Sequence, residues 1–232
     1  VASTSCAAPL LADTAIVVNA TQVFSTIDPA KANDYTEYMA AVNLYDGLTT
    51  VNGAGAIVPQ LAASWDVSDD SLTYTFHLDP AATFEDGSPV EASDVVYSLT
   101  RLLALNEGAS YLFAGLVDPA GIEAVDAKTV KISLNKVYAP FLTTTPLILI
   151  LNEDAVKAAS SEEWGEDAVA ADSFGAGPYG LETWNRGAEM IISRNEGYYA
   201  GWDKGTPIDT VRFVITNDEA TVKALATKGE LG

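Results

Sequence analysis

Apolar and polar side chains alternate over residues 72–78, and this stretch constrains the fold more than any other part of the chain. Leu72, Tyr74, Phe76 and Leu78 are separated by two threonines and His77. Because successive side chains of a strand point to opposite faces, a period of two predicts a strand with one buried face. Turn-forming residues at 69–71 and 84–87 lie on either side. The stretch therefore predicts one strand of a hairpin packed on a core.

Other segments carry the patterns of helices and of further strands. Over residues 93–106, Val95, Leu99, Leu102 and Leu103 fall on one helical face. The remaining elements expected are helices over 38–48 and 219–228, a short acidic helix or loop over 155–164, and strands at 16–19, 125–134, 181–184, 190–194 and 208–215, with turns at 126–128 and 185–187. The predicted fold class is α+β with a mixed α/β sheet.

The composition indicates a soluble globular protein and argues against nucleic acid as a partner. Of the 232 residues, 48% are hydrophobic, and 12 basic residues against 32 acidic ones give a formal net charge of −20. A field of that sign repels phosphate backbones and anionic lipid headgroups. It also favours a soluble monomer. The longest apolar run, residues 146–151, is far too short to cross a bilayer.

Residues 175–180, GAGPYG, fit the G-x-G-x-x-G pattern of a dinucleotide-binding loop. Such a loop needs a buried strand before it and a helix directly after it. Here residues 168–174 make a poor strand, and residues 180–194 alternate around a turn. Pro178 also lacks the N–H that would bind phosphate. The match is interpreted as accidental, and no cofactor is predicted.

No catalytic or metal-binding set stands out in the sequence. His77 is the one histidine, and on the polar face of its strand it would lack the enclosure that a triad base needs. One histidine and one cysteine exclude a zinc site of the usual type. The acidic run 162–167 lacks the ligand spacing of an EF-hand loop and predicts a solvated face. We therefore assign no catalytic or metal-ligating residue and do not expect an enzyme.

The N-terminal tail, residues 1–15, looks like the trimmed remains of an exported N-terminus. It contains Cys6, which is the one cysteine and so forms no internal disulfide. Three alternatives stay open for this thiol: attachment of a lipid, pairing with a cysteine outside this sequence, and a free thiol.

Several motifs resemble those of the extracytoplasmic solute-binding proteins of ABC importers, in the peptide- and nickel-binding family (family 5, dipeptide/oligopeptide type). The motifs are LYDGL at 44–48, LAASWDVSDDSLTYTFHL at 61–78, FEDGSP at 84–89, DVVYSL at 94–99, and a stretch over 175–199 similar to G-T-G-P-Y, W and R-N-x-x-Y-[WY]. They follow the family's order and spacing. Residues 79–82 and Glu91 depart from the family pattern, which weakens any subfamily assignment.

The resemblance implies a periplasmic-binding-protein-like fold of type II, with two lobes hinged around a buried ligand. Family members are longer than this chain. Residues 16–232 are therefore expected to be the first lobe only, with a smaller subdomain inserted at about 50–150 and the second lobe absent.

The resemblance also points to the loop after the first strand as the ligand-binding segment. Gln22, Val23 and Phe24 are the first expected contacts, followed by Asp34 and Tyr35 at the approach to the next helix. Phe24 is expected to be exposed in the polar loop 20–29, and a core position is the alternative for it.

A second group of residues is expected to shape the site without touching the ligand. Gly175, Gly177 and Pro178 belong to the G-T-G-P-Y-like motif. Glycine and proline favour tight turns. The three residues therefore predict a rigid turn near the junction of the lobes.

The implied function is capture of a solute outside the cytoplasmic membrane and its delivery to an ABC permease. A peptide is the first expectation, with an oligosaccharide, a nickel complex or an opine as alternatives. Two alternatives of other classes stay open: a glycoside-acting enzyme with an unrecognised carboxylate pair, and an adhesion or scaffold module. The implied location is periplasmic, or tethered to the membrane through a lipidated Cys6.

Overall fold

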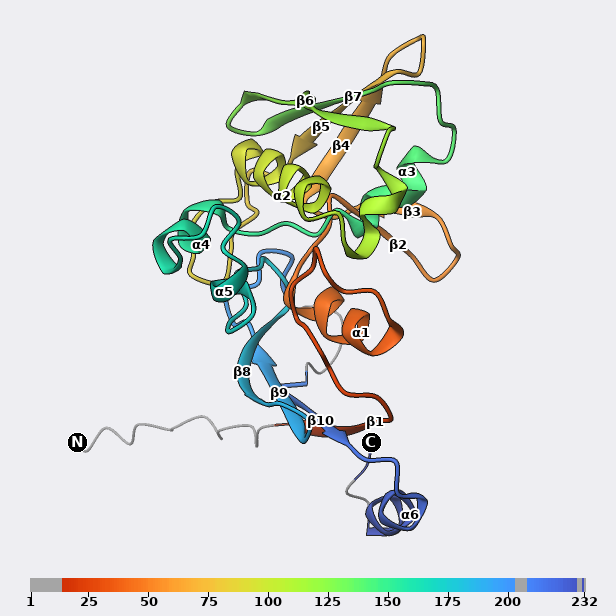
Figure 1. Cartoon of the computed structure of the whole chain (residues 1–232), viewed down its shortest axis with the longest axis vertical. Coiled ribbons are helices and arrows are strands. Elements are labelled where there is room, and N and C mark those ends of the chain that lie inside the picture. The colour runs from red at the N-terminus through yellow and green to blue at the C-terminus, as the bar shows by residue number, and fades with distance from the viewer. Residues whose placement is uncertain (1–13, 203–207, 229–230, 232) are drawn as a thin grey trace, which may run out of the picture.

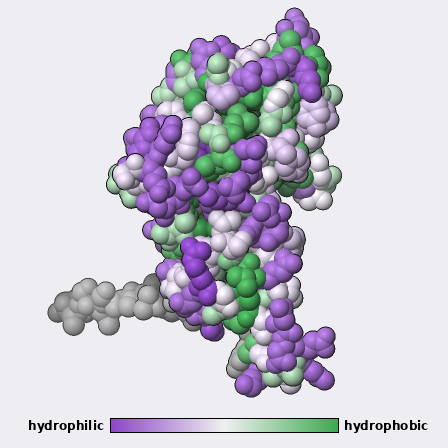
Figure 2. Space-filling view, viewed as in Figure 1, coloured by the Kyte–Doolittle hydropathy of each residue, from purple (hydrophilic) through white to green (hydrophobic). Residues whose placement is uncertain are grey.

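The computed structural model describes residues 14–202, 208–228 and 231 (Figure 1). Within these residues, two four-stranded sheets and one two-stranded ribbon are connected by helices. One four-stranded sheet lies in the upper part of Figure 1 and the other in the lower part. Helices and strands both occur along the chain, so the expected mixed α/β class is confirmed. Hydrophilic residues cover much of the face shown in Figure 2, as the acidic composition leads one to expect.

The upper sheet is antiparallel, with the strand order β4-β5-β7-β6. Its strands are β4 (Ala62–Val67), β5 (Thr73–Leu78), β6 (Val117–Asp126) and β7 (Thr129–Leu134). Tyr74, Phe76 and Leu78 are buried, which confirms the strand predicted from the alternation over 72–78. His77 lies on the other face, where its Nε2 is 2.9 Å from a carboxylate oxygen of Asp66 and its side chain is 44% exposed.

Helix α2 (Ala92–Leu105) packs against β6 and β7 and confirms the helix predicted over 93–106. Val95, Leu99 and Leu102 are buried as the pattern indicated, and Leu103, the fourth residue of the predicted face, is half-buried. The start of the helix is fixed by a carboxylate oxygen of Asp94, which accepts a hydrogen bond from the backbone N–H of Glu91 at 2.8 Å. Its end is set by Asn106 in the left-handed conformation, with φ of 55°.

The lower sheet has the order β1-β10-β9-β8 and is built from the two ends of the chain. Its strands are β1 (Ala15–Ala20), β8 (Tyr179–Asn185), β9 (Glu189–Arg194) and β10 (Thr210–Ile215). Strand β1 runs parallel to β10, whereas the β10–β9 and β9–β8 pairs are antiparallel. The sequence predicted the hairpin and β10 correctly. Most of β1 is half-buried rather than buried, because it lies at the edge of the sheet.

The remaining elements surround these two sheets. They are α1 (Tyr35–Leu44), the ribbon of β2 (Thr49–Val51) and β3 (Ile57–Pro59), the 3₁₀ turns η1 (Gly108–Leu112) and η2 (Thr145–Leu147), and helices α3 (Phe141–Thr144), α4 (Glu153–Ala159), α5 (Glu166–Val169) and α6 (Glu219–Lys228). Helix α6 has the predicted bounds, yet none of its described residues is buried. No helix within the described ranges is both long and apolar enough to cross a membrane.

Helix α1 begins three residues before the pattern predicted over 38–48 and ends at Leu44, close to the stop predicted at residues 46–47. Tyr45 is already extended, with φ of −130° and ψ of 141°. The backbone carbonyls of Gly47 and Leu48 accept hydrogen bonds from Leu61 and Ala62. This pairing holds residues 47 and 48 outside the helix, and the LYDGL motif is extended after Leu44.

Strand β6 begins at Val117, well before the strand expected at 125. Pro119 and Gly121 interrupt the alternation in this stretch, and the pairing with β7 shifts register between Val117 and Ile122. An irregular strand of this kind leaves no period of two in the sequence.

Buried apolar side chains form two clusters. The larger takes all its buried members from residues 48–150 except Ala30 and Ala176. The smaller joins α1 to the lower sheet and includes Phe24, Leu44 and Phe213. The subdomain boundaries near 50 and 150 stay a prediction, and Cys6 with most of the predicted tail lies outside the described residues.

Candidate functional site

The candidate site is the segment between β1 and α1, residues 21–33, which we call the solute loop. It leaves the end of β1 at Ala20 and returns to the start of α1. Gln22 and Val23 are exposed, and 49% of Val23 is accessible. These two predicted contacts therefore present their side chains on the surface of the loop.

Phe24 points the other way. Only 1% of it is exposed, and its ring packs edge-on against that of Phe213 on β10, with centroids 5.3 Å apart. The expectation of an exposed Phe24 is wrong, and the core alternative describes its position. The physical reason is that the apolar face of the β1–β10 pair needs a cover, and this aromatic ring supplies it.

Asp34 and Tyr35 lie together where the solute loop enters α1. Asp34 is the N-cap residue, and its Oδ1 accepts a hydrogen bond from the backbone N–H of Glu37 at 2.9 Å. Tyr35 is 79% exposed. The carboxylate thus has a structural task in the helix start, whereas the phenol ring beside it is open to a ligand.

A buried carboxylate closes the solute loop onto α1, and sequence reasoning missed it. Glu37 is 1% exposed, and its Oε2 accepts a hydrogen bond from the backbone N–H of Asn33 at 2.8 Å. Its Oε1 accepts a hydrogen bond from the hydroxyl of Ser25. The signal available in the sequence is the D-x-x-E spacing of Asp34 and Glu37, which is typical of a helix start.

A second buried carboxylate anchors the middle of the loop to α2. Both guanidinium Nη atoms of Arg101 donate to Asp28 at 2.6 Å, and the two side chains are 0% and 1% exposed. Arg101 Nε donates to the carbonyl of Trp164 at 2.7 Å. Burial opposes the charge on Arg101, but the hydrogen bonds and attraction of Asp28 raise its pKa above the ordinary value. The solute loop is therefore bound to the larger core cluster.

Tyr111 is an exposed aromatic residue near the end of the solute loop that sequence reasoning also missed. It is 75% exposed and belongs to η1. This turn packs on the loop, since a Cβ at Gly108 would lie 2.7 Å from the carbonyl oxygen of Ala30. Burial, followed by the nearby Tyr111 and Glu37, raises the pKa of Tyr38 on α1. No periodic pattern in the sequence marks this residue.

Gly175, Gly177 and Pro178 pack on the end of α1. A Cβ at Gly175 would lie 2.0 Å from the carbonyl oxygen of Leu44, and one at Gly177 would lie 2.4 Å from that of Asn43. The Pro178 carbonyl accepts a hydrogen bond from the Asn195 N–H at 2.8 Å. The glycines are thus required for close backbone approach. Their role as a turn at the junction of two lobes stays a prediction.

A buried carboxylate connects the LYDGL motif to the R-N-x-x-Y-Y motif. Asp46 is 0% exposed and accepts hydrogen bonds from Gln60 Nε2 at 2.7 Å, Tyr198 Oη at 3.0 Å and Tyr199 Oη at 2.8 Å. Burial raises the pKa of Asp46 from 3.8 to about 6, against the opposing effect of these three bonds. Two motifs far apart in the sequence therefore share one titratable contact.

Replacing Asp46 with asparagine is expected to change how stability depends on pH. Because the pKa of Asp46 is higher in the folded chain than in the unfolded one, protonation of Asp46 stabilises the fold. This stabilisation is fully present below pH 3.8 and is lost as the pH rises through about 6. The difference between these values corresponds to about 3 kcal/mol. The Asp46→Asn variant should therefore gain stability relative to the wild type between pH 4.5 and 7, measured by urea unfolding. The exposed Asp69→Asn variant is the control and should show less than about 0.5 kcal/mol of such change.

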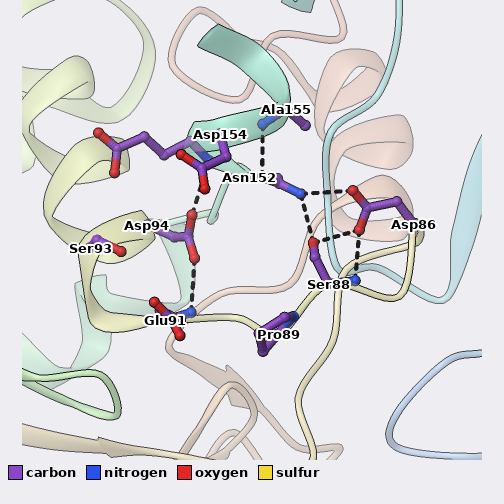
Figure 3. Close-up of a pocket in the computed structure, with 10 residues that line it drawn as sticks. Asp86, Ser88, Pro89, Glu91, Ser93, Asp94, Asn152, Asp154 and Ala155 are labelled. Atoms are coloured by element: carbon purple, nitrogen blue, oxygen red, sulfur yellow. Dashed lines mark hydrogen bonds between the residues drawn. The ribbon is translucent and has the colours of Figure 1, made fainter. Parts of the chain in front are cut away.

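An acidic pocket of about 440 Å³ lies between the starts of α2 and α4 (Figure 3). Two of its carboxylates, those of Asp86 and Asp94, accept hydrogen bonds from the protein itself. Asp94 accepts hydrogen bonds from the Glu91 and Glu153 backbones, and Asp86 accepts them from Ser88 and Asn152. Burial raises the pKa of Asp94 to about 6. In the described part of the chain no group of three or more acidic, histidine or cysteine side chains could hold a metal ion.

Comparisons with known proteins agree with this architecture. The family model described as bacterial extracellular solute-binding proteins, family 5 Middle, matches residues 56–232. A glutathione-binding protein, GsiB, of Salmonella paratyphi A is 32% identical over 99% of this chain and 43% of its own length. The chain thus spans less than half the length of this curated relative.

Two solved structures share the fold. The murein tripeptide binding protein MppA of Escherichia coli has a TM-score of 0.80 and 28% identity, over 96% of this chain and 46% of that one. OppA of Haemophilus influenzae, in complex with RPPGFSPFR, has a TM-score of 0.81 and 27% identity over the same shares. The protein belongs to family 5 of the bacterial extracellular solute-binding proteins.

Proposed function

We propose that the protein captures a peptide-like solute outside the cytoplasmic membrane and delivers it to the membrane subunits of an ABC permease. The observation that carries this proposal is membership of the family together with the named cargo of the relatives. Those relatives bind glutathione, a murein tripeptide and the peptide RPPGFSPFR. All three ligands contain amide backbones and carboxylate groups, so a peptide-like solute is the chemical class that they share.

The proposed contact surface is the exposed side of the solute loop and its surroundings. Gln22 and Val23 offer an amide and an apolar side chain, and Tyr35 and Tyr111 offer exposed rings. Aromatic rings supply large contact area at a small entropic cost, which suits the variable side chains of peptides. Phe24 contributes through its backbone alone, because its side chain is in the core.

Rigidity of the solute loop supports this assignment. Glu37 holds Ser25 and Asn33, and the buried pair of Asp28 and Arg101 holds the middle of the loop. A loop fixed before binding loses little conformational entropy when the ligand arrives. Closure of a second lobe over this surface would then bury the solute, as hinge-closing receptors do.

The alternatives from other classes receive less support. Family 5 comprises solute-binding proteins, so a glycoside-acting enzyme and an adhesion module are set aside. Oligosaccharides, nickel complexes and opines remain alternatives as the solute. The proposed location is extracytoplasmic and the proposed state is a monomer, consistent with the net charge of −20.

The test uses the full-length protein. Reduced glutathione and trialanine are expected to raise its melting temperature, and at equal concentration the tighter ligand should raise it more, since a ligand that binds the native state stabilises it by RT ln(1 + [L]/Kd). Maltotriose should not. Isothermal titration should then give about three- to tenfold weaker binding for Val23→Ala, because the variant removes apolar contact area at the site. The matched control is Val125→Ala, since Val125 is 53% exposed and distant in sequence. Binding of maltotriose alone, or of no solute, would refute the proposal.

A further inference from the structure

Arg186 lies in the turn that joins β8 to β9, at the same end of the lower sheet as the solute loop. Strand β8 is antiparallel to β9, which is antiparallel to β10, and β10 is parallel to β1. Strands β8 and β1 therefore run in the same direction and end on the same side. The contact between the two segments agrees, because Arg186 Nη1 is 3.5 Å from the carbonyl oxygen of Ser25 in the solute loop.

The guanidinium of Arg186 is held in place by neutral partners. Its Nη2 donates to the carbonyl of Ala170 at 2.6 Å, and its Cζ lies 3.9 Å from the ring centroid of Trp184. Stacking on an indole and hydrogen bonding to carbonyls fix the plane of the group without neutralising its charge. A guanidinium carries five N–H donors, so donors remain for a ligand.

Arg186 differs in this respect from the other arginines of the chain. Arg101, Arg194 and Arg212 each form an ion pair with a carboxylate. Arg186 is exposed and forms none with any carboxylate in the described residues. In a sequence with 32 acidic and 12 basic residues, an arginine kept free of carboxylates is a specific arrangement.

The surroundings limit the kind of anion that fits. Asp167, Asp172 and Glu182 line a groove of about 490 Å³ in which Arg186 also lies, while the hydrogen bonds of Arg186 go to the carbonyls of Ser25 and Ala170. Their negative charges oppose a polyanion such as phosphate. A single carboxylate that forms two parallel hydrogen bonds with the guanidinium matches the geometry and adds the least repulsion.

We propose that Arg186 binds a carboxylate group of the solute and so selects peptide-like solutes with a free acid. The inference rests on the proposed function and adds a specificity-determining residue to it. Peptides carry such a group at their C-terminus. The position beside Ser25 allows a solute on the exposed face of the loop to reach the guanidinium, and the existing hydrogen bonds hold it ready for that contact.

The test compares acids with their neutral analogues on the full-length protein by isothermal titration. The probes are trialanine against its C-terminal amide, and reduced glutathione against its glycine ethyl ester. The wild type should bind the free acid at least about tenfold more tightly in one of the two pairs. Arg186→Gln should reduce that preference to about twofold or less by weakening the acid alone. Arg186→Lys should fall between the two, since an ammonium cannot form the two parallel bonds.

Arg212→Gln is the matched control, because it removes one exposed positive charge from the same sheet, and it should keep the preference of the wild type. If Arg186→Gln keeps the preference, or weakens acid and neutral probes equally, the inference is wrong while the proposed function stands. If the wild type binds none of the four probes, the proposed function fails and this inference fails with it. The inference would also be contradicted if Arg186→Gln lowered the melting temperature while Arg186→Lys kept the full preference for the free acid. That pair of results would assign Arg186 a structural role.

Discussion

The Arg101→Ala variant is expected to lose about 3–5 kcal/mol of unfolding free energy, because it breaks a buried ion pair. Arg101 and Asp28 are both buried, and they form two hydrogen bonds of 2.6 Å. Removing the guanidinium leaves the Asp28 carboxylate buried without its ion partner, with the Ala30 N–H still donating to it at 2.9 Å. The carbonyl of Trp164 loses its 2.7 Å bond and keeps the longer one from Tyr97 Oη at 3.3 Å. The loss comes mainly from that uncompensated charge rather than from the attraction between the ions.

Urea unfolding at pH 7 measures this loss. The control is Arg212→Ala, because the Arg212–Glu189 pair is exposed and such pairs contribute about 0–1 kcal/mol. The double variant Asp28→Leu with Arg101→Met should recover much of the stability, since replacing a whole buried pair by apolar groups is often neutral. A loss below about 1 kcal/mol for Arg101→Ala would mean that water reaches the pair and that the described burial is wrong.

The same pair connects stability to binding. Asp28 lies in the middle of the solute loop, and Arg101 belongs to α2. Breaking the Asp28–Arg101 pair should allow the solute loop to move before binding. Ordering the loop on binding then costs conformational entropy, which lowers the affinity. The double variant restores packing but not the two hydrogen bonds of fixed geometry. It should therefore recover more stability than affinity.

The Phe24→Ala variant is expected to lose about 3–5 kcal/mol, because deleting a buried aromatic side chain removes its transfer free energy and leaves a cavity. The ring is 1% exposed and packs on Phe213. Its edge-on contact with that ring adds to the area that it buries. This outcome would separate the core role of Phe24 from the ligand-contact role expected from the family resemblance.

Thermal and urea unfolding, together with titration of trialanine into the full-length protein, provide the measurement. Phe24→Leu is the conservative variant and should lose about 1 kcal/mol while keeping the affinity of the wild type within about twofold. Val23→Ala is the matched control on the neighbouring exposed residue and should do the opposite, with stability kept and affinity reduced. Full stability of Phe24→Ala combined with lost binding would restore Phe24 as a ligand contact.

Local patterns predicted those parts of the fold in which neighbours in the sequence settle the structure. The alternation over 72–78 became β5, the heptad-like face of α2 was buried as expected, and the turn after β8 joined a hairpin. Each depends on periodicity and turn residues, which act over a few positions. The patterns failed in the first half of β6, where shifts in the register of pairing with β7 interrupt the alternation.

The candidate site was only partly accessible from the sequence. The resemblance pointed to the loop after β1, and in the structure Gln22 and Val23 on this loop and Tyr35 at the start of α1 are exposed. Their contact with a solute stays a prediction. The resemblance did not reveal that Phe24 turns inward. Exposure depends on which side of the loop faces Phe213, a residue far along the chain. Glu37 and Tyr111 were missed for a similar reason, because their partners are set by packing.

The sequence alone determined the family and the mixed α/β class, because these follow from motifs and from short-range patterns of side chains. Tertiary structure alone decided which charged groups are buried and paired. Asp28 with Arg101, and Asp46 with Tyr198 and Tyr199, come together from separate segments. The physical reason is that burial and desolvation are properties of the packed chain. The fold therefore decides which partners a carboxylate has and how its pKa is shifted. It also decides that Arg186 forms no ion pair with a carboxylate of the described residues.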